Sequence, residues 1–431
     1  MRTLKVALLG CGTVGGEVAR HLTGHAAELA GRIGAPVELA GIAVRRTGLA
    51  RPGVPDRLVT TDADALVRRG DIDVVIEVIG GTDPARGLIT AAFAHGASVV
   101  SANKALIAAE GAELHAAAAA RGVDLYYEAA VAGAVPLLRP LRESLAGDRV
   151  NRVMGILNGT TNFILDKMHS AGWDYPRALK EATALGYAEA DPTADVEGYD
   201  AAAKAAILAG FAFGARVPVD AVHREGITAI TAADIDDAKA AGCVMKLVAV
   251  CERGADGLSV NARVHPAMIR SDHPLASVRG AYNAVMVEAD AAGELTFHGP
   301  GAGGAPTASA VLGDLVTVCR NKLAGVTGPG DAARDRPAVR PMAEVVSRYH
   351  LSLDLGPDLD TNGQADVLAE TATVLSRYGV SVASLSQQRR DGRFSLALST
   401  HPATHATLSA AVCALRDMAP VQRVTSVIRL G

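Results

Sequence analysis

The stretch Lys5-Val-Ala-Leu-Leu-Gly-Cys-Gly-Thr-Val-Gly15 decides the fold of the N-terminal third of this chain. It begins with a short apolar run of the kind that forms a buried strand, and apolar residues at helical spacing follow the glycines. Gly10 permits a tight turn, Gly12 lets a pyrophosphate approach the backbone, and Gly15 lets helix and strand pack closely. The order strand, glycine turn, helix predicts a Rossmann-type dinucleotide-binding domain.

The start of the helix after this turn suits an anionic ligand. The backbone N–H groups of Thr13 and Val14 would lack helical partners, and the helix dipole adds positive potential there. A purely structural glycine turn is the alternative interpretation.

Two arginines follow the second expected strand, residues 37–44, which should end beside the adenosine ribose of the ligand. An acidic residue at this place binds the ribose 2′-hydroxyl of NAD, whereas this chain offers Arg45 and Arg46. Because a guanidinium suits a 2′-phosphate, the sequence favours NADP(H), with NAD(H) still usable. A pair of exposed arginines without a ligand is the alternative.

Strand-like and helical segments alternate to about residue 135, which predicts an α/β fold with a parallel sheet. A helix is expected next, from Pro136 to about Ala146. The expected strand over residues 97–103 ends at Lys104. Ligands of open parallel sheets bind outside the carboxyl ends of the strands, so Lys104 should face the nicotinamide or the substrate. The alternative is a solvated surface lysine.

A cluster of carboxylates runs from Glu189 into a helix that carries Asp200 and Lys204. Positions four apart lie on one helical face, and this face continues through the apolar Ile207 and Phe211. A charged pair that points inward is costly unless it is matched or used, which makes it a candidate catalytic pair. An ordinary exposed helix pair is the alternative.

A second glycine cluster, Gly299-Pro-Gly-Ala-Gly-Gly304, precedes another helical pattern. Because glycines have no side chains, this segment can bring its backbone close to a ligand. We expect the chain to return here to the cofactor cleft; a flexible loop is the alternative.

Composition narrows the class of protein. With 431 residues, 49% of them hydrophobic, the chain can form two or three domains with large cores. A net charge of 42 − 46 = −4 gives no reason to expect nucleic acid or an anionic membrane as a partner. No apolar run is long enough to span a bilayer, and no signal peptide is visible. Five scattered cysteines fit reduced thiols, so we expect a cytoplasmic protein.

With these motifs in this order, the chain resembles the homoserine dehydrogenase family over nearly its whole length. That family reversibly reduces L-aspartate 4-semialdehyde to L-homoserine with NADPH or NADH. The matching motifs are Gly10-x-Gly12-x-x-Gly15, Ser101-Ala-Asn-Lys104, Tyr127-Glu-Ala-Ala-Val-Ala-Gly133, Asn158-Gly-Thr-Thr-Asn162, Leu185-Gly-Tyr-Ala-Glu-Ala-Asp-Pro192, Asp195-Val-Glu-Gly-x-Asp200-x-x-x-Lys204 and Gly299-x-Gly-Ala-Gly303.

The resemblance implies a role for each candidate site residue. Lys204 is similar to the catalytic proton donor, and Lys104 to a lysine that lies beside nicotinamide and substrate. Glu189 and Asp200 look like the residues that bind the amino group of the substrate. Backbone contacts to the cofactor in relatives correspond to Gly186 and Gly303. A sodium site in relatives corresponds to the carboxylate of Glu128 and the carbonyls of Val131, Gly133 and Val135.

Residues 346–431 are expected to form a βαββαβ, ferredoxin-like domain. It resembles an ACT domain, the amino-acid-sensing module found at this position in many relatives. Such domains usually carry an Asp-x-Pro-Gly turn before their first helix, and the segment Gln364-Ala-Asp-Val-Leu-Ala369 has neither Pro nor Gly. Threonine as an effector is one expectation for this domain; a structural or dimerising role is the other.

The expected plan has an NAD(P)-binding domain over residues 1–135, completed by 299–328, and an α+β substrate and dimerisation domain over 136–298. A linker over 329–345 leads to the ACT-like domain. We expect a homodimer or homotetramer. Because no aspartokinase-like domain precedes the dehydrogenase part, the chain resembles the monofunctional form.

Two other functions are weighed against this one. A semialdehyde dehydrogenase that works through a thioester needs an activated cysteine near the nicotinamide, and Cys11 lies instead inside the phosphate turn. A non-catalytic NADP or amino-acid sensor would have no need of a proton donor, so the set of Lys104, Glu189, Asp200 and Lys204 speaks against it.

Overall fold

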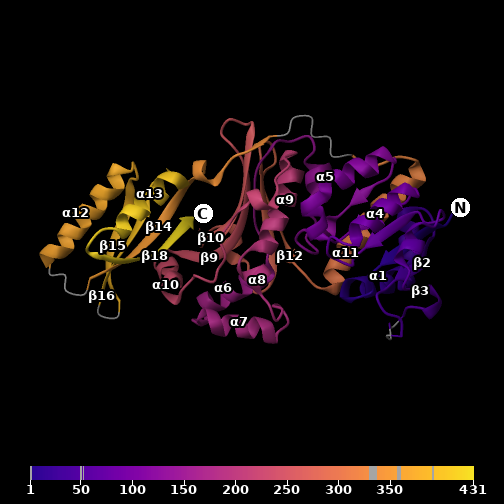
Figure 1. Ribbon diagram of the computed structural model, residues 1–431, viewed down its shortest axis with the longest axis horizontal. Coiled ribbons are helices and arrows are strands. Elements are labelled where there is room, and N and C mark those ends of the chain that lie inside the picture. The colour runs from indigo at the N-terminus through magenta and orange to yellow at the C-terminus, as the bar shows by residue number, and fades with distance from the viewer. Residues whose placement is uncertain (1, 49–50, 52, 330–336, 357–360, 391–392) are drawn as a thin grey trace.

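Three bodies lie in a row along the long axis of the molecule (Figure 1). The computed structural model describes residues 2–48, 51, 53–329, 337–356, 361–390 and 393–431. The N-terminus lies at one end of the row, whereas the C-terminus lies near its middle (Figure 1). No helix in these ranges is both long enough and apolar enough to cross a membrane.

The N-terminal body is built on a parallel six-stranded sheet in the order β3-β2-β1-β4-β5-β6. The turn after β1 and the ends of β2 and β5 therefore meet at one edge, where ligands of such sheets bind. The strands are β1 (Leu4–Leu9), β2 (Val37–Ala43), β3 (Val59–Thr60), β4 (Val74–Glu77), β5 (Ser98–Ser101) and β6 (Leu125–Tyr126).

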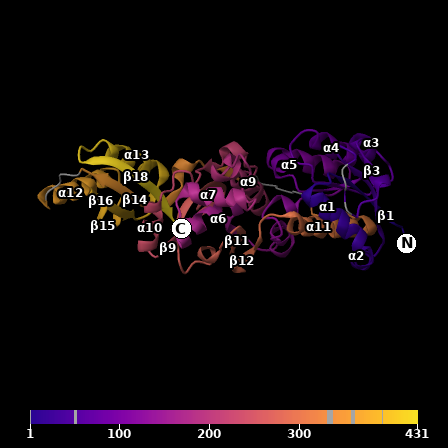
Figure 2. The ribbon, with the colours of Figure 1, turned by 90° about the horizontal axis from the view of Figure 1, so that it is seen from below.

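Helices cover both faces of this sheet, because successive strand residues point to opposite sides. Leu8 packs in one core with α1, α2 and α11, and Leu9 packs in another with α3, α4 and α5. Helix α11, which comes far later in the chain, lies beside α1 in both views (Figures 1 and 2). The helices are α1 (Thr13–Gly24), α2 (Ala26–Ile33), α3 (Ala63–Val67), α4 (Ala85–Ala94), α5 (Lys104–Ala120) and α11 (Gly304–Ala324).

The central body is a mixed sheet in the order β12-β11-β7-β9-β10, with helices packed on it. Helix α9 contacts both this sheet and α5, so it lies at the boundary with the N-terminal body. The elements are β7 (Val150–Ile156), α6 (Gly159–Ala171), α7 (Tyr175–Ala184), α8 (Thr193–Val196), α9 (Tyr199–Phe213), β8 (His223–Arg224), α10 (Ala232–Ala240), β9 (Cys243–Arg253), β10 (Ser259–Arg270), β11 (Tyr282–Ala289) and β12 (Gly293–Pro300).

The C-terminal body has the βαββαβ order that the sequence predicts, with an antiparallel sheet in the order β18-β14-β16-β15. This is a ferredoxin-like arrangement. Its elements are β14 (Val346–Leu355), α12 (Thr361–Arg377), β15 (Val382–Arg390), β16 (Arg393–Thr400), β17 (Ala403–Thr404), α13 (His405–Arg416) and β18 (Val421–Leu430).

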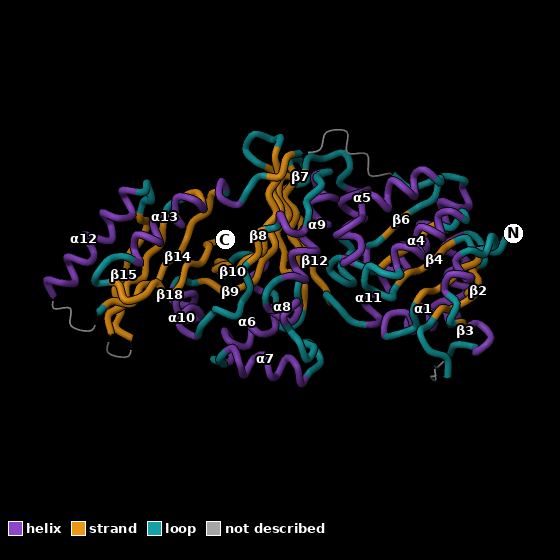
Figure 3. The backbone as a smooth tube through the Cα atoms, viewed as in Figure 1, coloured by secondary structure: helices purple, strands orange, loops and turns teal. Residues whose placement is uncertain are grey.

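The central and C-terminal sheets are joined by hydrogen bonds. Strand β18 lies parallel to β10 and pairs Arg429 with Ala267 and Leu430 with Met268. Arg429 also donates to Glu225 of the central body at 2.8 Å. Figure 3 shows the strands running from one body into the next, which explains why the chain ends near the middle of the molecule.

Two expectations from the sequence differ from the structure. The helix expected from Pro136 to about Ala146 is shorter: helical residues run from 138 to 144, and Pro140–Ser144 is π-helical. The amides of residues 137–139 donate to the side chain of Glu128, which therefore caps the start of this helix. The expected linker over 329–345 contains a short strand, β13 (Ala338–Val339), paired with β10; its residues 330–336 lie outside the described ranges.

The close packing at the first glycine turn predicts contrasting effects of alanine at two neighbouring glycines. A Cβ at Gly15 would lie 2.1 Å from the Gly10 carbonyl, whereas one at Gly16 meets nothing within 4 Å. Gly15→Ala should therefore lower the free energy of unfolding by about 1–3 kcal/mol. Gly16→Ala, the matched control in the same helix, should raise it by up to about 1 kcal/mol. Thermal and urea unfolding of both variants measures this; equal effects would contradict the packing.

Candidate active site

The candidate catalytic pair lies on the inward face of α9. Lys204 Nζ donates to Asp200 Oδ2 at 2.7 Å, and the two residues are 9% and 7% exposed. Both groups are thus shielded from water. In the protein interior a charge pair interacts more strongly than in water and is costly to separate.

Lys104 reaches the same aspartate from the other body. It is the first residue of α5, where Asn103 caps the helix by accepting from Leu106 N at 3.2 Å. The amide of Asn103 also donates to the Gly81 carbonyl at 2.6 Å, which ties the start of α5 to the loop after β4. From this position Lys104 Nζ forms an ion pair with Asp200 Oδ1. One carboxylate therefore lies between two lysines from different bodies.

The two lysines determine the charge of Asp200. Burial alone would raise the pKa of this carboxyl, but the charges of Lys204 and Lys104 outweigh it and hold the pKa well below its usual range. Asp200 is consequently a carboxylate at neutral pH. Lys104, with its side chain 47% exposed, is the more accessible of its partners.

Backbone and amide groups complete the surroundings of the pair. The Leu157 carbonyl accepts a second hydrogen bond from Lys204 Nζ at 2.7 Å. Asn158 caps α6 by accepting from Thr161 N at 2.9 Å, while its Nδ2 donates to Asp200 at 3.0 Å and to Asp195 at 2.6 Å. An ammonium has three hydrogens, so Asp200 and Leu157 leave one of the hydrogens of Lys204 for a further acceptor.

Asp195 is a second carboxyl at this site that the sequence analysis did not single out. The pKa of Asp195 is raised, chiefly by burial and also by the negative charge of Asp200. The hydrogen bond from Asn158 and the charges of the two lysines lower it by less. Two carboxyl groups bridged by one amide thus differ in their tendency to hold a proton. The Asp-x-x-x-x-Asp spacing was visible in the sequence, but the bridge is formed by a residue some forty positions earlier.

Glu189 and Gly186 lie in the loop between α7 and α8. Glu189 is exposed, and no hydrogen bond or ion pair joins it to another residue that the structure describes. The loop is attached to α6 because Thr160 Oγ1 donates to the Tyr187 carbonyl at 2.7 Å. Unlike Lys104, Asp200 and Lys204, the Glu189 carboxylate is not assembled into the charged cluster in this structure.

Two helix N-termini meet at the glycine turn after β1. Helix α1 begins after Gly12 and α11 after Gly303, both without a side-chain cap. A Cβ at Gly304 would lie 2.9 Å from the Thr13 carbonyl, and one at Gly12 would meet nothing within 4 Å. The open space at Gly12 next to uncapped N–H groups suits a pyrophosphate. The second glycine cluster therefore returns to the first.

Arg45 and Arg46 follow β2 at the same edge of the sheet and are exposed. The carbonyl of Arg46 accepts a hydrogen bond from Arg51 Nη2 at 2.8 Å, which keeps the side chain of Arg51 beside Arg46. The guanidinium groups are accessible to a ligand at the end of β2.

The loop proposed for sodium is tightly packed. Glu128 accepts from the amides of residues 137–139 at 2.6–2.8 Å, so of about four acceptor positions on a carboxylate one stays open. Val131, Gly133 and Val135 are buried nearby, and a Cβ at Gly133 would lie 2.4 Å from the Gly301 carbonyl. Among the described residues, no three His, Cys, Asp or Glu side chains lie close enough to bind a metal ion.

Asp314 of α11 contacts both ends of the segment between Glu128 and Arg139. It accepts from Glu128 N at 2.7 Å and pairs with Arg139 at 2.7 Å. Burial, followed by the charge of Glu128, raises the pKa of Asp314 to about 6.

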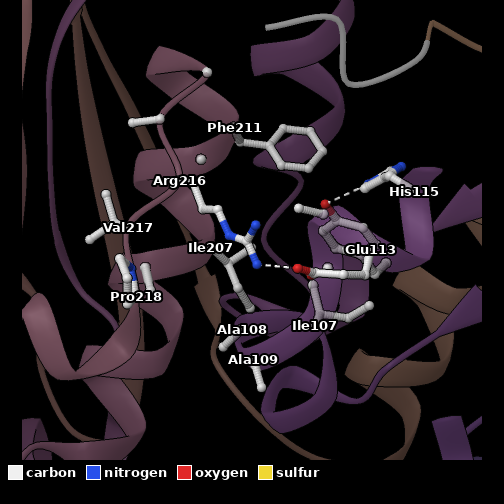
Figure 4. Close-up of a pocket in the computed structure, with 17 residues that line it drawn as sticks. Ile107, Ala108, Ala109, Glu113, His115, Ile207, Phe211, Arg216, Val217 and Pro218 are labelled. Carbon is white, nitrogen blue, oxygen red and sulfur yellow. Dashed lines mark hydrogen bonds and ion pairs between the residues drawn. The ribbon is translucent and has the colours of Figure 1, made fainter. Parts of the chain in front are cut away.

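Behind the lysine–aspartate cluster, α5 and α9 line a cavity of about 170 Å³. Figure 4 shows Ile107 and Ile207, each three residues after one of the site lysines, on its walls. Arg216, just beyond α9, forms an ion pair with Glu113 of α5 across this cavity (Figure 4). Helix α5 is therefore joined to α9 by Lys104–Asp200 and to the segment just after α9 by Glu113–Arg216.

Comparison with known proteins agrees with the sequence resemblance. Residues 10–128 match the family model described as homoserine dehydrogenase, NAD binding domain, and residues 136–316 match the homoserine dehydrogenase model. The homoserine dehydrogenase of Corynebacterium glutamicum is 53% identical over 99% of this chain and 95% of its own.

Solved structures agree as well. A homoserine dehydrogenase from Thiobacillus denitrificans has a TM-score of 0.92 at 37% identity, over 100% of this chain and 99% of its own. A hyperthermophilic archaeal homoserine dehydrogenase in complex with NADPH has a TM-score of 0.63 at 28% identity. It matches 74% of this chain and 98% of its own.

The raised pKa of Asp314 predicts a pH-dependent contribution to stability. The folded protein binds the proton more tightly than an unfolded aspartate, so this contribution is present at low pH and is lost as pH rises through about 6. Relative to Asp314→Asn, the wild type should gain about 1–1.5 kcal/mol of unfolding free energy between pH 8 and pH 5.

Asp148→Asn is the control for this measurement. Amides of Ala291 and Ala292 lower the pKa of Asp148, so its carboxylate stays charged at both pH values. Its difference from wild type should not change between pH 8 and pH 5. Parallel urea titrations test both variants, and a pH-independent difference for Asp314→Asn would contradict the buried-carboxyl account.

Proposed function

The chain belongs to the homoserine dehydrogenase family of NAD(P)-dependent oxidoreductases, and we propose that it interconverts L-aspartate 4-semialdehyde and L-homoserine with Lys204 as the proton donor. The observation that carries the role of Lys204 is its pair of fixed acceptors, Asp200 and the Leu157 carbonyl. They orient the ammonium and leave one hydrogen to donate.

In the reducing direction, the bound coenzyme supplies a hydride to the aldehyde carbon. Negative charge then develops on the aldehyde oxygen, and an ammonium aimed at that oxygen stabilises it. Lys204 gives its proton to this oxygen and becomes a neutral amine, so the product is the alcohol. In the oxidising direction, neutral Lys204 accepts the hydroxyl proton. Lys104, from the coenzyme-binding body, lies on the other side of Asp200 and lines the same site.

The amino group of the substrate is assigned to Asp200 and Glu189. Asp200 is charged at neutral pH, and its Oδ1 is paired with a lysine whose side chain is half exposed. Glu189 lies exposed on a loop that is anchored at Tyr187, and can meet a ligand that enters from solvent.

We assign the coenzyme pyrophosphate to the two uncapped helix starts, with contacts from Gly10, Gly12, Thr13, Val14, Gly15 and Gly303, and a further backbone contact from Gly186. NADP(H) is the preferred form, because Arg45 and Arg46 stand exposed after β2 where a 2′-phosphate would lie. The archaeal relative in complex with NADPH supports a nicotinamide coenzyme in this family.

A sodium ion is proposed beside the open acceptor position of Glu128, with the carbonyls of Val131, Gly133 and Val135. Such hard oxygen ligands suit a hard cation. Homoserine oxidation should then be faster in sodium than in tetramethylammonium buffer; equal rates would remove sodium from the account.

We assign residues 1–135 with 299–328 to coenzyme binding, 136–298 to substrate binding and dimerisation, and 346–431 to an ACT-like domain that responds to threonine, with 329–345 as the linker. The ferredoxin-like order of the last part supports this assignment. A threonine titration without effect on rate would leave that domain a structural or dimerising role. A solution mass of one chain would contradict the proposed homodimer or homotetramer.

A thioester mechanism is disfavoured by the state of the cysteines. Burial raises the pKa of Cys11 despite the nearby Arg51 and raises the pKa of Cys251 and Cys319 to about 12. Thiols of this kind are poor nucleophiles at neutral pH.

Removing the ammonium of Lys204 should abolish most of the catalytic rate. Lys204→Ala is expected to lower kcat for homoserine oxidation by about 10²–10⁴-fold. Coenzyme binding should be unchanged, because Lys204 lies outside the glycine turn. Absorbance of the reduced nicotinamide measures the rate, and exposed Lys180→Ala serves as the control. Wild-type kcat in Lys204→Ala would refute its role.

Replacing both arginines after β2 should change the choice of coenzyme. The double variant Arg45→Ala/Arg46→Ala loses charge-assisted contacts to a 2′-phosphate and should raise KM for NADP⁺ by about 10–100-fold. Kinetics with NAD⁺, which lacks this phosphate, should be unaffected. A parallel loss with both coenzymes would contradict the assignment.

A further inference from the structure

A second side chain shares the carbonyl that holds Lys204. Asn283, the second residue of β11, donates from Nδ2 to the Leu157 carbonyl at 3.1 Å, and Lys204 Nζ donates to the same oxygen at 2.7 Å. Three distant parts of the chain thus converge on one oxygen atom. The amide of Asn283 fixes the carbonyl, which in turn fixes the ammonium.

The orientation of this amide is determined by its neighbour. With nitrogen and oxygen exchanged, Asn283 Oδ1 would face the Leu157 carbonyl oxygen, and two acceptors would repel each other. Asn283 is 0% exposed, and its Oδ1 is buried without a hydrogen-bond partner among the described residues. A half-satisfied buried amide is costly compared with an apolar side chain. Its donor to Leu157 is therefore the feature that the site uses.

Asn283 also contacts the glycine segment that leads to the coenzyme site. A Cβ at Gly301 would lie 2.1 Å from Asn283 Oδ1, so only glycine fits beside this amide. Three residues later, Gly304 lies against the carbonyl of Thr13 in the phosphate turn. The side-chain amide of Asn283 therefore lies between the Leu157 carbonyl, which binds Lys204, and Gly301 in the segment that leads to the coenzyme site.

We propose that Asn283 is a positioning residue for the reaction. It holds the Leu157 carbonyl in the one place where Lys204 keeps its third hydrogen directed at the substrate oxygen, and Gly301 couples this orientation to the coenzyme segment. The inference rests on the proposed role of Lys204 as proton donor. In this proposal Asn283 acts through the Leu157 carbonyl and Lys204, not on the substrate or the coenzyme directly.

The first test removes the amide. Asn283→Ala frees the Leu157 carbonyl, and misplacing a catalytic group by about 1 Å can cost about 10²-fold in rate. We expect kcat for homoserine oxidation to fall by about 10–100-fold, with KM for homoserine and the Kd of NADPH within about threefold of wild type.

The second test changes the charge beside Lys204. The charged and titratable groups around its ammonium are Asp200, Lys104 beyond it, and Asp195 through Asn158. Asn283→Asp adds a carboxylate that favours the ammonium over the neutral amine that oxidation requires. The acid limb of the kcat profile should move to higher pH by about one unit. This shift would place residue 283 within electrostatic reach of Lys204, and the fall in kcat of Asn283→Ala at unchanged KM then separates positioning from a merely structural role.

Asn261→Ala is the matched control. Asn261 is also a buried strand asparagine that donates to a backbone carbonyl, that of Arg340, at 2.9 Å. It should lose stability but keep kcat within about twofold, since it lies away from the acid–base pair. Equal kcat values for Asn283→Ala and Asn261→Ala, with an unshifted profile for Asn283→Asp, would overturn the proposal.

Two further variants keep the result decisive. If neither Asn283 variant folds, Gly301→Ala displaces the amide from the other side, and wild-type kcat in that variant would overturn the inference. Lys204→Ala separates this proposal from the proposed function. If Lys204→Ala retains activity, the function assigned to Lys204 fails; if it is inactive while Asn283 variants behave as wild type, only the positioning role fails.

Discussion

A single buried carboxylate, Asp200, holds the catalytic region together. It lies between Lys204 of its own helix and Lys104 of the coenzyme-binding body, so one charge joins the two bodies where they meet. Burial alone would favour the neutral acid, and the two lysines keep it charged. Moving the bodies apart would take Lys104 away from Asp200 and leave Lys204 as its charged partner, so part of the charge balance that keeps Asp200 ionised depends on the contact between the bodies. The relative position of α5 and α9 is thus part of the proposed active site.

Segments that are distant in sequence also pack together at the coenzyme-binding end. The chain leaves the first body after residue 135, builds the central sheet and returns through Gly299–Gly303 to place the start of α11 beside that of α1. Glycines are needed where the backbone meets the backbone: a Cβ at Gly133 would collide with the Gly301 carbonyl, and one at Gly304 with the Thr13 carbonyl. Since β11 and the return segment follow each other closely, the anchor of Lys204 and the phosphate turn belong to one continuous packing unit.

Local patterns predicted most of the fold and part of the site. The glycine turn, the strand alternation and the Asp200–Lys204 spacing depend on neighbouring residues, and the structure has each of them. The ion pair of Lys104 with Asp200 and the second role of Asn158 depend on residues far apart in sequence. As a helix cap, Asn158 uses only its oxygen, and no local pattern reveals where its nitrogen points. Glu128 accepts hydrogen bonds from the first amides of the helix expected after Pro136, again a contact that only the fold creates.

A crystal structure with oxidised coenzyme and L-homoserine bound tests the central claim most directly. The account predicts the substrate hydroxyl within hydrogen-bond distance of Lys204 Nζ, with Lys204 still on the Leu157 carbonyl and the substrate ammonium on Asp200. A complex in which homoserine binds away from Asp200, or in which Lys204 turns from Leu157 and no longer faces the hydroxyl, would contradict it.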